Sequence, residues 1–154
     1  MTGQGTDIPT RSLHKASSRP PSGTEPLVDV VLPVRNYARY LARSLSSILA
    51  QRERRIRVIA VDYGSSDETP RLLAEHAARD PRVDVRRVET ASLVEALNTG
   101  LAAAKAPFVA RQDADDISYP ERLGRQIAAF AADPGLVAVS GSCLHIDADG
   151  ALTG

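Results

Sequence analysis

Val28–Val34 reads VDVVLPV and Ile56–Val61 reads IRVIAV. Both stretches are short, rich in β-branched residues and almost entirely apolar, which is typical of strands that are covered on both faces. Between them, apolar residues recur at helical spacing and predict an amphipathic helix with Asn36 as its N-cap. The apolar stripe of this helix consists of Leu41, Leu45, Ile48 and Leu49. Two buried strands joined by a helix predict a parallel sheet.

The alternation of strand and helix continues along the chain. Val83–Val88 (VDVRRV) predicts a strand nearer an edge of the sheet, and Phe108–Ala110 and Leu136–Ser140 (LVAVS) predict two more. The turn residues of Asp147–Gly150 (DADG) predict the tip of a hairpin. Four rounds of this alternation indicate a three-layer α/β domain with a mostly parallel sheet.

The later helices carry start signals. Ser65 with Glu68, and Ser92 with Glu95, have the spacing of a capping box, and Pro70 suits a first helical turn. The expected inward-facing residues are Leu72 and Leu73 in the second helix, Leu93, Leu97 and Leu101 in the third, and Leu123, Ile127 and Phe130 in the fourth, which Pro120 opens.

Composition limits the class of protein. The chain has 154 residues, which is room for one domain of ordinary size. Its 19 Lys and Arg balance 19 Asp and Glu, so long-range attraction to nucleic acid or to an anionic membrane is not expected. The single cysteine, Cys143, excludes an intramolecular disulfide and is expected to be buried.

The chain divides into a leader and a domain. Residues 1–26 are polar, rich in Ser, Thr, Gly and Pro and without apolar period, and are expected to be disordered; residues 27–154 form the domain. No apolar run approaches the roughly 18 to 20 residues that cross a bilayer, and the first residues lack the apolar core of a secretory signal. These features predict a cytoplasmic domain, at most peripheral at the inner face of the membrane.

The chemistry is expected in loops at the carboxyl ends of the strands, where open parallel sheets bind ligands. Three loops qualify: Pro33–Tyr37, Asp62–Thr69 and Arg111–Tyr119. The third is the most informative, since Asp113, Asp115 and Asp116 follow a buried strand. Like charges that close raise one another's pKa unless a cation relieves them, and Mg²⁺ or Mn²⁺ suits such oxygen ligands.

Explanations of the acidic residues that need no metal stay open. Carboxylates are also stabilised by the dipole of a solvated helix N-terminus. An EF-hand fits poorly, because Ile117 and Ser118 stand where an oxygen ligand and a glycine are needed. In the second loop, Asp62 and Gly64 suit either a nucleobase contact or a plain strand-to-helix turn. No dinucleotide-binding or P-loop glycine motif is present.

Four stretches together resemble the glycosyltransferases of family 2, which have the GT-A fold. They are Val28–Asn36 (VDVVLPVRN), Ile59–Thr69 (IAVDYGSSDET), Ala96–Gly100 (ALNTG) and Phe108–Leu123 (FVARQDADDISYPERL). The resemblance implies a nucleotide-diphospho-sugar donor, a divalent metal (Mn²⁺ or Mg²⁺), inversion at the anomeric carbon, and a role in making cell-surface polysaccharide. The acceptor, a glycan, lipid or protein, is not implied.

The resemblance also implies site residues. Asp115 and Asp113 match the D-x-D motif and would hold the metal, with Asp115 as the direct ligand. Asp62 matches the acid that contacts the base. The remaining nucleotide-sugar-binding positions are Pro33, Val34, Arg35, Asn36 and Ala114, with Asn98 at the pocket edge.

Two departures from the family stand out. Tyr63 replaces a second acid or Asn in the second loop, which leaves the base preference open. No general base is found, because the family's base lies well downstream of the D-x-D, beyond Gly154. Two hypotheses therefore compete: the donor-binding half of an inverting glycosyltransferase, and a nucleotide-sugar-binding module without turnover. A sugar-phosphate nucleotidyltransferase fits less well, because its glycine-rich loop after the first strand is missing.

Overall fold

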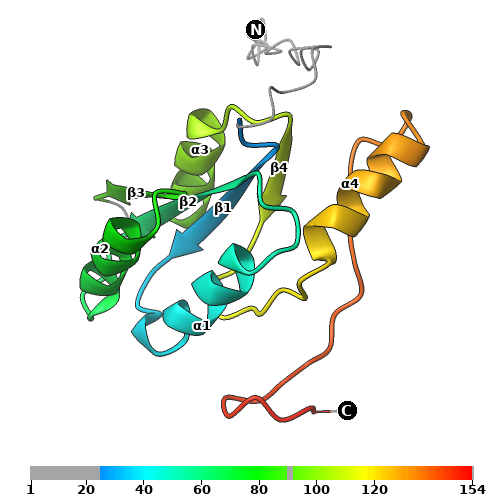
Figure 1. The fold of residues 1–154 in the computed structure, drawn as a ribbon. Helices are drawn as coiled ribbons and strands as arrows, with labels where there is room; N and C mark the ends of the chain where they lie inside the picture. Colours follow the sequence, from blue (N-terminus) through cyan, green and yellow to red (C-terminus); the bar gives the residue numbers. More distant parts are fainter. Residues whose placement is uncertain (1–24, 90–91, 154) are drawn as a thin grey trace, which may run out of the picture.

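The computed structural model describes residues 25–89 and 92–153, so all but the last two residues of the expected leader lie outside it. At its centre is a parallel sheet in the order β3-β2-β1-β4 (Figure 1). The strands are β1 (Val28–Val34), β2 (Ile56–Tyr63), β3 (Val83–Val88) and β4 (Phe108–Arg111). All residues of β1 are buried, as its apolar sequence predicts. The four strands and the edge position of β3 are confirmed.

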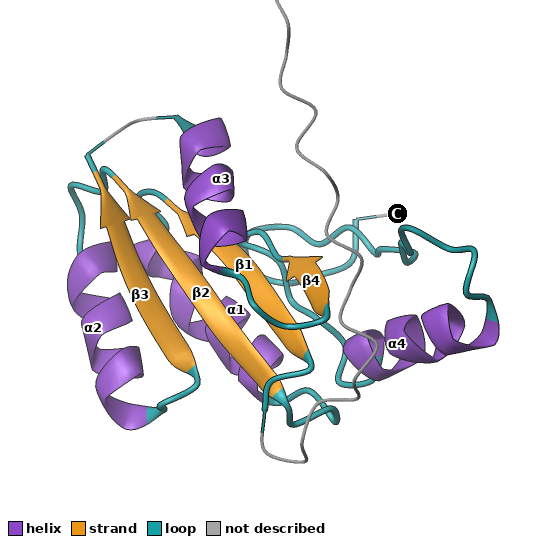
Figure 2. Ribbon diagram, turned by 90° about the horizontal axis from the view of Figure 1, so that it is seen from above, coloured by secondary structure: helices purple, strands orange, loops and turns teal. Residues whose placement is uncertain are grey.

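Helices cover both faces of the sheet. They are α1 (Ala38–Leu49), α2 (Thr69–Arg79), α3 (Leu93–Ala103) and α4 (Arg122–Ala132). Figure 2 shows α3 on one face and α1 and α2 on the other. The chain moves outward from β1 to β3 and then returns across the sheet to β4. Right-handed crossovers made in opposite directions place their helices on opposite faces, which gives the predicted three-layer fold.

The core has two parts that follow the strand alternation. On one face Leu32 of β1 and Val58 of β2 pack against Leu41 and Leu45 of α1. On the other face Ile59 and Val61 of β2 pack against Ala96 of α3. The helix α4 lies beside β4, where the rings of Phe108 and Phe130 stack with centroids 5.1 Å apart. No helix within the described residues is both long enough and apolar enough to cross a bilayer.

The end of β1 is open on the β4 side. The ladder between them stops at Val31 opposite Arg111, and β1 continues for three more residues. Pro33 lies in this overhang, so its missing N–H faces no strand and costs no ladder hydrogen bond. The direction of strand addition also reverses between β1 and β4, and such a switch point is where open α/β sheets bind ligands.

The packing of α3 corrects one prediction. Its buried residues are Ala96 and Gly100, while Leu93 and Leu101 are exposed. A Cβ at Gly100 would lie 2.4 Å from Cγ1 of Val31, so α3 sits too close to β1 for a leucine at this position. Small side chains therefore face the sheet, and the leucine stripe lies to one side of the contact.

Other predictions also fail near the C-terminal end. Leu136–Ser140 forms no strand, and Val137 is 96% exposed; an apolar β-prone run becomes a strand only where a neighbouring strand supplies hydrogen bonds. Cys143 is exposed rather than buried. The predicted hairpin tip is confirmed, because an antiparallel bridge joins Ile146 to Leu152 across Asp147–Gly150.

Candidate functional site

The loop after β1 turns through an unusual backbone conformation. Asn36 has φ of 57°, in the left-handed region that asparagine tolerates better than most residues. Its N–H donates to Oγ of Ser65 at 3.0 Å, and its Oδ1 accepts from the N–H of Ser66 at 2.8 Å. These bonds fasten the loop after β1 to the loop after β2.

The start of α1 is capped by that second loop and not by Asn36 as predicted. The N–H of Ala38 donates to Oδ2 of Asp67 at 3.1 Å, and the N–H of Tyr37 donates to Oγ1 of Thr69 at 3.0 Å. Burial would raise the pKa of Asp67, but hydrogen bonds from Thr69 and Ala38 hold it below its ordinary value. The capping box expected at Ser65 is absent as well, because α2 begins only at Thr69 and the Glu68 side chain makes no cap. The Asp67 carboxylate thus serves both helices, because its other oxygen accepts the N–H of Thr69 at the start of α2 at 2.9 Å.

Asp62 is a buried carboxylate with one oxygen unused. It lies one residue before the end of β2, is 1% exposed, and accepts the N–H of Ser65 on Oδ1 at 3.0 Å. Within the described residues its Oδ2 has no hydrogen-bond partner, and only a long ion pair of 3.9 Å joins it to Nε of Arg87. A buried carboxylate oxygen without a hydrogen bond is costly, so this atom could accept a hydrogen bond from a ligand.

The acidic loop after β4 contains carboxylates in different states. Asp113 pairs with Arg111 through two contacts of 3.0 and 3.2 Å. The Asp115 carboxylate is exposed and makes no hydrogen bond or ion pair with any residue of 25–89 or 92–153. Partial loss of hydration, together with the charges of Asp113 and Asp115, raises the pKa of Asp116. The loop therefore concentrates negative charge that the protein only partly neutralises.

The acidic loop and the loop after β1 lie together. The charge of Asp115 is the main reason that the pKa of Tyr37 is raised, with smaller effects from burial, Tyr63 and Asp113. Ser44 of α1 also donates to the carbonyl of Asp113 at 3.2 Å. All three expected loops are thus adjacent at the carboxyl edge of the sheet. They follow β2, β1 and β4, which are neighbours in that order.

The remaining predicted residues take different positions around this edge. Val34 and Ala114 are buried and shape the wall, and Pro33 lies in the overhang of β1. Arg35 is exposed and makes no ion pair with any residue that the structure describes. The three loops bring all the predicted positions except Asn98 to this edge.

The acidic loop suits a metal that shares its ligands with a substrate. Among the described residues, no group of three or more His, Cys, Asp or Glu side chains is placed to hold an ion by itself. Mg²⁺ and similar ions are commonly bound through one or two carboxylates, with substrate phosphates and water as the other ligands. Asp115, whose oxygens have no partner in the part of the chain that the structure describes, would fit that role directly; Asp113 would first have to leave Arg111.

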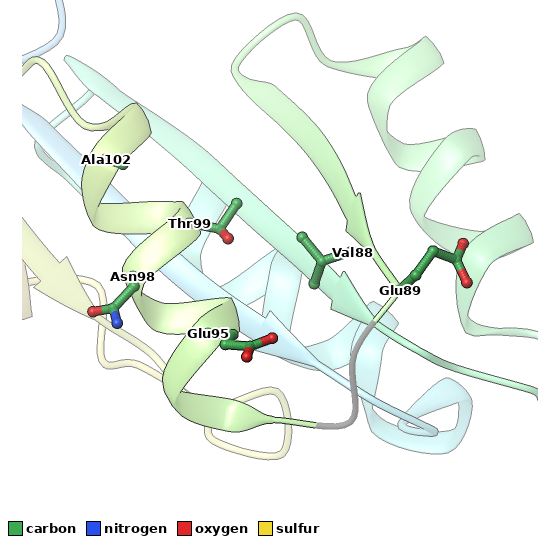
Figure 3. Close-up of a pocket in the computed structure, with 6 residues that line it drawn as sticks. All are labelled: Val88, Glu89, Glu95, Asn98, Thr99 and Ala102. Carbon is green, nitrogen blue, oxygen red and sulfur yellow. The ribbon is translucent and has the colours of Figure 1, made fainter.

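A separate pocket of about 470 Å³ lies between α3 and the end of β3 (Figure 3). Asn98, expected at the edge of the nucleotide pocket, instead lines this separate hollow, together with Glu89, Glu95 and Thr99 over an apolar wall of Val88 and Ala102. Its two carboxylates and lack of a basic side chain disfavour an anion such as a diphosphate. This hollow is therefore a poorer candidate for a diphosphate than the edge formed by the three loops.

Sequence reasoning missed residues that act through their neighbours. Arg87 stands beside Asp62 because the register of β2 and β3 pairs these positions. Gln112 and Arg122 bond to each other beneath the acidic loop. Only the Arg87 position had a signal, a pair of arginines that interrupts the alternation of the strand near its carboxyl end. The contact of Gln112 with Arg122 depends on how the loop folds.

The model of the family described as Glycosyl transferase family 2 matches residues 29–151. Chondroitin synthase of Escherichia coli is 31% identical over 127 residues, which cover 82% of this chain and 18% of that protein. The putative glycosyltransferase EpsE of Bacillus subtilis is 37% identical over 105 residues, 67% of this chain and 38% of that protein. The chain therefore spans well under half the length of these curated relatives.

Solved structures agree with the sequence matches. S. aureus TarS 1–349 in complex with UDP-GlcNAc superimposes with a TM-score of 0.62 at 26% identity, covering 68% of this chain and 31% of that one. The mannosyltransferase PcManGT from Pyrobaculum calidifontis, in complex with GDP-Man and Mn²⁺, gives a TM-score of 0.61 at 28% identity and covers 70% of this chain and 33% of that one.

Proposed function

The chain belongs to glycosyl transferase family 2, and from that premise we propose that residues 27–154 bind the nucleotide-diphospho-sugar donor of an inverting, metal-assisted sugar transfer. The observation that carries the proposal is a pair of carboxylates at the carboxyl edge of the sheet. Asp62 keeps one buried oxygen without a hydrogen bond, and Asp115 keeps both oxygens free of partners among the described residues.

Asp62 is proposed to bind the nucleobase. Its Oδ2 can accept one hydrogen bond, and the guanidinium of Arg87 nearby can donate one. An acceptor beside a donor matches the N–H and C=O of uracil, thymine or guanine. The same pair also matches the amino N–H and ring nitrogen of adenine, so it does not select the base by itself. The structural neighbours in complex with UDP-GlcNAc and GDP-Man support a UDP or GDP sugar.

Asp115 is proposed to hold the divalent ion, with Asp113 beside it. When bound, the ion neutralises charge that builds up on the diphosphate as the glycosidic bond breaks. The loop after β1 would shape the nucleotide pocket through Pro33, Val34 and Asn36. Arg35 in the same loop, which has no ion pair within the described residues, could offer its positive charge to the diphosphate of the donor. The acceptor hydroxyl and the general base that deprotonates it would come from outside residues 27–154.

The test is to measure nucleotide binding by the purified chain. Calorimetry with UDP, GDP and UDP-GlcNAc, each with and without Mn²⁺, gives the affinities. We expect metal-dependent binding in the unaltered chain. Asp115→Ala should weaken that binding at least about a hundredfold, because it removes a carboxylate that is proposed to bind the metal directly, and charge-assisted contacts are strong.

Asp84→Ala is the matched control for Asp115→Ala. It removes a carboxylate that pairs with Arg86 near the amino end of β3, away from the loops. Unchanged metal-dependent affinity in the Asp115 variant, with melting temperatures equal to the control, would reject the metal role. Binding without any metal requirement would favour a nucleotide-binding module with different chemistry.

A further inference from the structure

A single buried amide fills the inside of the acidic loop. Gln112 is 2% exposed, and its Nε2 donates to the carbonyl of Asp116 at 3.0 Å. Its Oε1 accepts from Oγ of Ser118 and from Nη1 of Arg122, both at 2.6 Å. The loop carrying Asp113, Asp115 and Asp116 is therefore folded around a side chain of its own.

Arg122, at the start of α4, completes this arrangement. Besides Gln112, its Nη1 donates to Oγ of Ser118 at 2.8 Å, and its Nη2 donates to the carbonyl of Arg111 at 2.7 Å. The Arg122 guanidinium thus binds Arg111 at the end of β4, Gln112 inside the loop and Ser118 near the end of the loop. The forked geometry of arginine suits this task, and a lysine ammonium could not reach all three oxygens in the same way.

The charge of Arg122 has no carboxylate in contact with it. All three acceptors are neutral oxygens, and no ion pair joins Arg122 to any described residue. Burial lowers the pKa of Arg122, and the charge of Asp116 acts in the opposite direction. Asp116 of the acidic loop is thus a negative charge that acts on Arg122, and a fixed cation there reduces the mutual repulsion of the loop's carboxylates.

The outside of the loop is fastened to α1 by a row of polar side chains. Ser47 accepts the N–H of Ser118 at 3.0 Å. Gln51, which is fully buried, donates to the carbonyl of Tyr119 at 2.7 Å and accepts the N–H of Leu123 at 3.0 Å. The carboxyl end of the loop is thus fixed to Ser47 of α1 and to Gln51 just beyond α1, while Gln112 fills its middle and Arg122 joins its two ends.

We infer that Arg122 is a positioning residue that holds the acidic loop, through Gln112 and Ser118, in its ligand-binding shape before any ligand arrives. The part of this inference that concerns ligand affinity rests on the proposed function. The part that concerns loop order does not. A loop ordered beforehand spares the ligand the entropy of ordering it, which raises affinity.

The test compares Arg122→Gln with Arg125→Gln, a control on the same helix. The Arg125 side chain is exposed and has no hydrogen bond or ion pair with any described residue, so the two variants make the same change of charge. In the ligand-free chain, Arg122→Gln should speed amide hydrogen exchange at residues 113–118 about tenfold, since a charged hydrogen bond to a buried acceptor is lost. Exchange in β1 and β2 should stay as in the control.

A second readout is the affinity for Mn²⁺ with UDP, which should fall about tenfold in Arg122→Gln. Arg122→Lys keeps the charge without the fork, so it should restore part of the affinity and little of the exchange protection. Ser118→Ala, which removes one acceptor of Arg122 and one donor to Gln112, serves if Arg122→Gln does not fold; it should raise loop exchange in the same residues.

Equal loop exchange in the Arg122 and Arg125 variants would overturn the inference. If the unaltered chain binds no Mn²⁺ and UDP, the proposed function fails, while the exchange comparison still decides the role of Arg122. Faster exchange throughout the sheet would assign Arg122 to general stability and would also overturn it.

Discussion

At the scale of single residues, the site contains groups that weaken the fold. Asp62 is the clearest example, because its buried Oδ2 has no hydrogen bond within the described residues, and only a long ion pair of 3.9 Å to Arg87 offsets the cost of burying it. A ligand N–H would supply the missing partner. The carboxylate is therefore better explained by binding than by folding.

Asp62→Asn separates these two effects. The amide keeps an oxygen for the N–H of Ser65 but presents an N–H₂ where an acceptor was free. The free energy of unfolding should rise by about 1 kcal/mol, because a buried charge is removed. Urea denaturation measures this rise. Affinity for UDP should fall, because the amide N–H₂ opposes the base N–H.

Asp84→Asn makes the same chemical change at a residue that already has a partner, Arg86. It should leave nucleotide binding unchanged. If Asp62→Asn lowers stability while nucleotide affinity is kept, Asp62 is a structural residue and its assignment to the base is wrong.

At the scale of elements, the close approach of α3 to β1 depends on one glycine. Gly100 is buried, and an added Cβ would lie 2.4 Å from Cγ1 and 3.2 Å from Cγ2 of Val31. Val31 is a β-branched side chain held inside the core, so it cannot swing aside. The separation of helix and sheet is therefore set by the absence of a side chain.

Gly100→Ala should lower the free energy of unfolding by about 1 to 3 kcal/mol, the usual cost of overpacking a core. Without the clash, alanine in a helix interior would be the better residue. Gly124→Ala in α4 is the matched control, because nothing lies within 4 Å of its added Cβ. It should raise stability by up to about 1 kcal/mol. Two changes of the same sign in thermal denaturation would contradict this account of α3.

This glycine also shows how far sequence patterns could predict the structure. The strands β1 and β2 were predicted because continuous β-branched apolar runs have few alternatives. The inner face of α3 was not, because periodicity ranks leucine above glycine as a buried residue. Asn36 was mistaken for a helix cap, since the oxygen that caps α1 lies in another loop, on Asp67. Contacts between loops depend on the finished sheet and have no local signal.

Prediction of the candidate site met the same limit. Asp62 and Asp115 were proposed because they stand at the carboxyl ends of predicted strands, and strand ends meet at one edge of a parallel sheet. The strand before Asp115 proves to be half-exposed at the sheet edge and not buried as expected. Arg122 was missed, because its role depends on the fold of a loop ten residues earlier. Residues that touch a ligand leave a motif in the sequence more often than residues that hold the loop in shape.

At the scale of the whole molecule, one buried ion pair joins both sides of the sheet switch point. Asp29 of β1 is fully buried and accepts from Nε and Nη2 of Arg57 in β2 at 2.9 and 2.8 Å. It also accepts the N–H groups of Lys105 and Ala106, just before β4, at 2.6 and 2.9 Å. Arg57 in turn donates to the carbonyl of Ala103 at the end of α3. Four elements therefore meet at one carboxylate, at the end of the sheet opposite the ligand loops.

Asp29→Asn should lower the free energy of unfolding on the order of 3 kcal/mol, because it leaves the Arg57 charge half-buried without its partner. Burial alone would raise the pKa of Asp29, but the bonds from Arg57, Ala106 and Lys105 outweigh it and lower the pKa below 3.8. The folded state thus holds the proton less tightly than the unfolded state. The stabilisation is complete above pH 3.8 and is lost as the pH falls through the lower, folded value. Urea denaturation from pH 7 to pH 3 should show the unaltered chain losing stability at the acid end, and the variant losing less.

Because the pair lies far from the three loops, nucleotide affinity at pH 7 should be the same in both proteins at temperatures where both are folded. A variant with normal stability, or an equally steep acid loss in both proteins, would show that other carboxylates hold the four elements together.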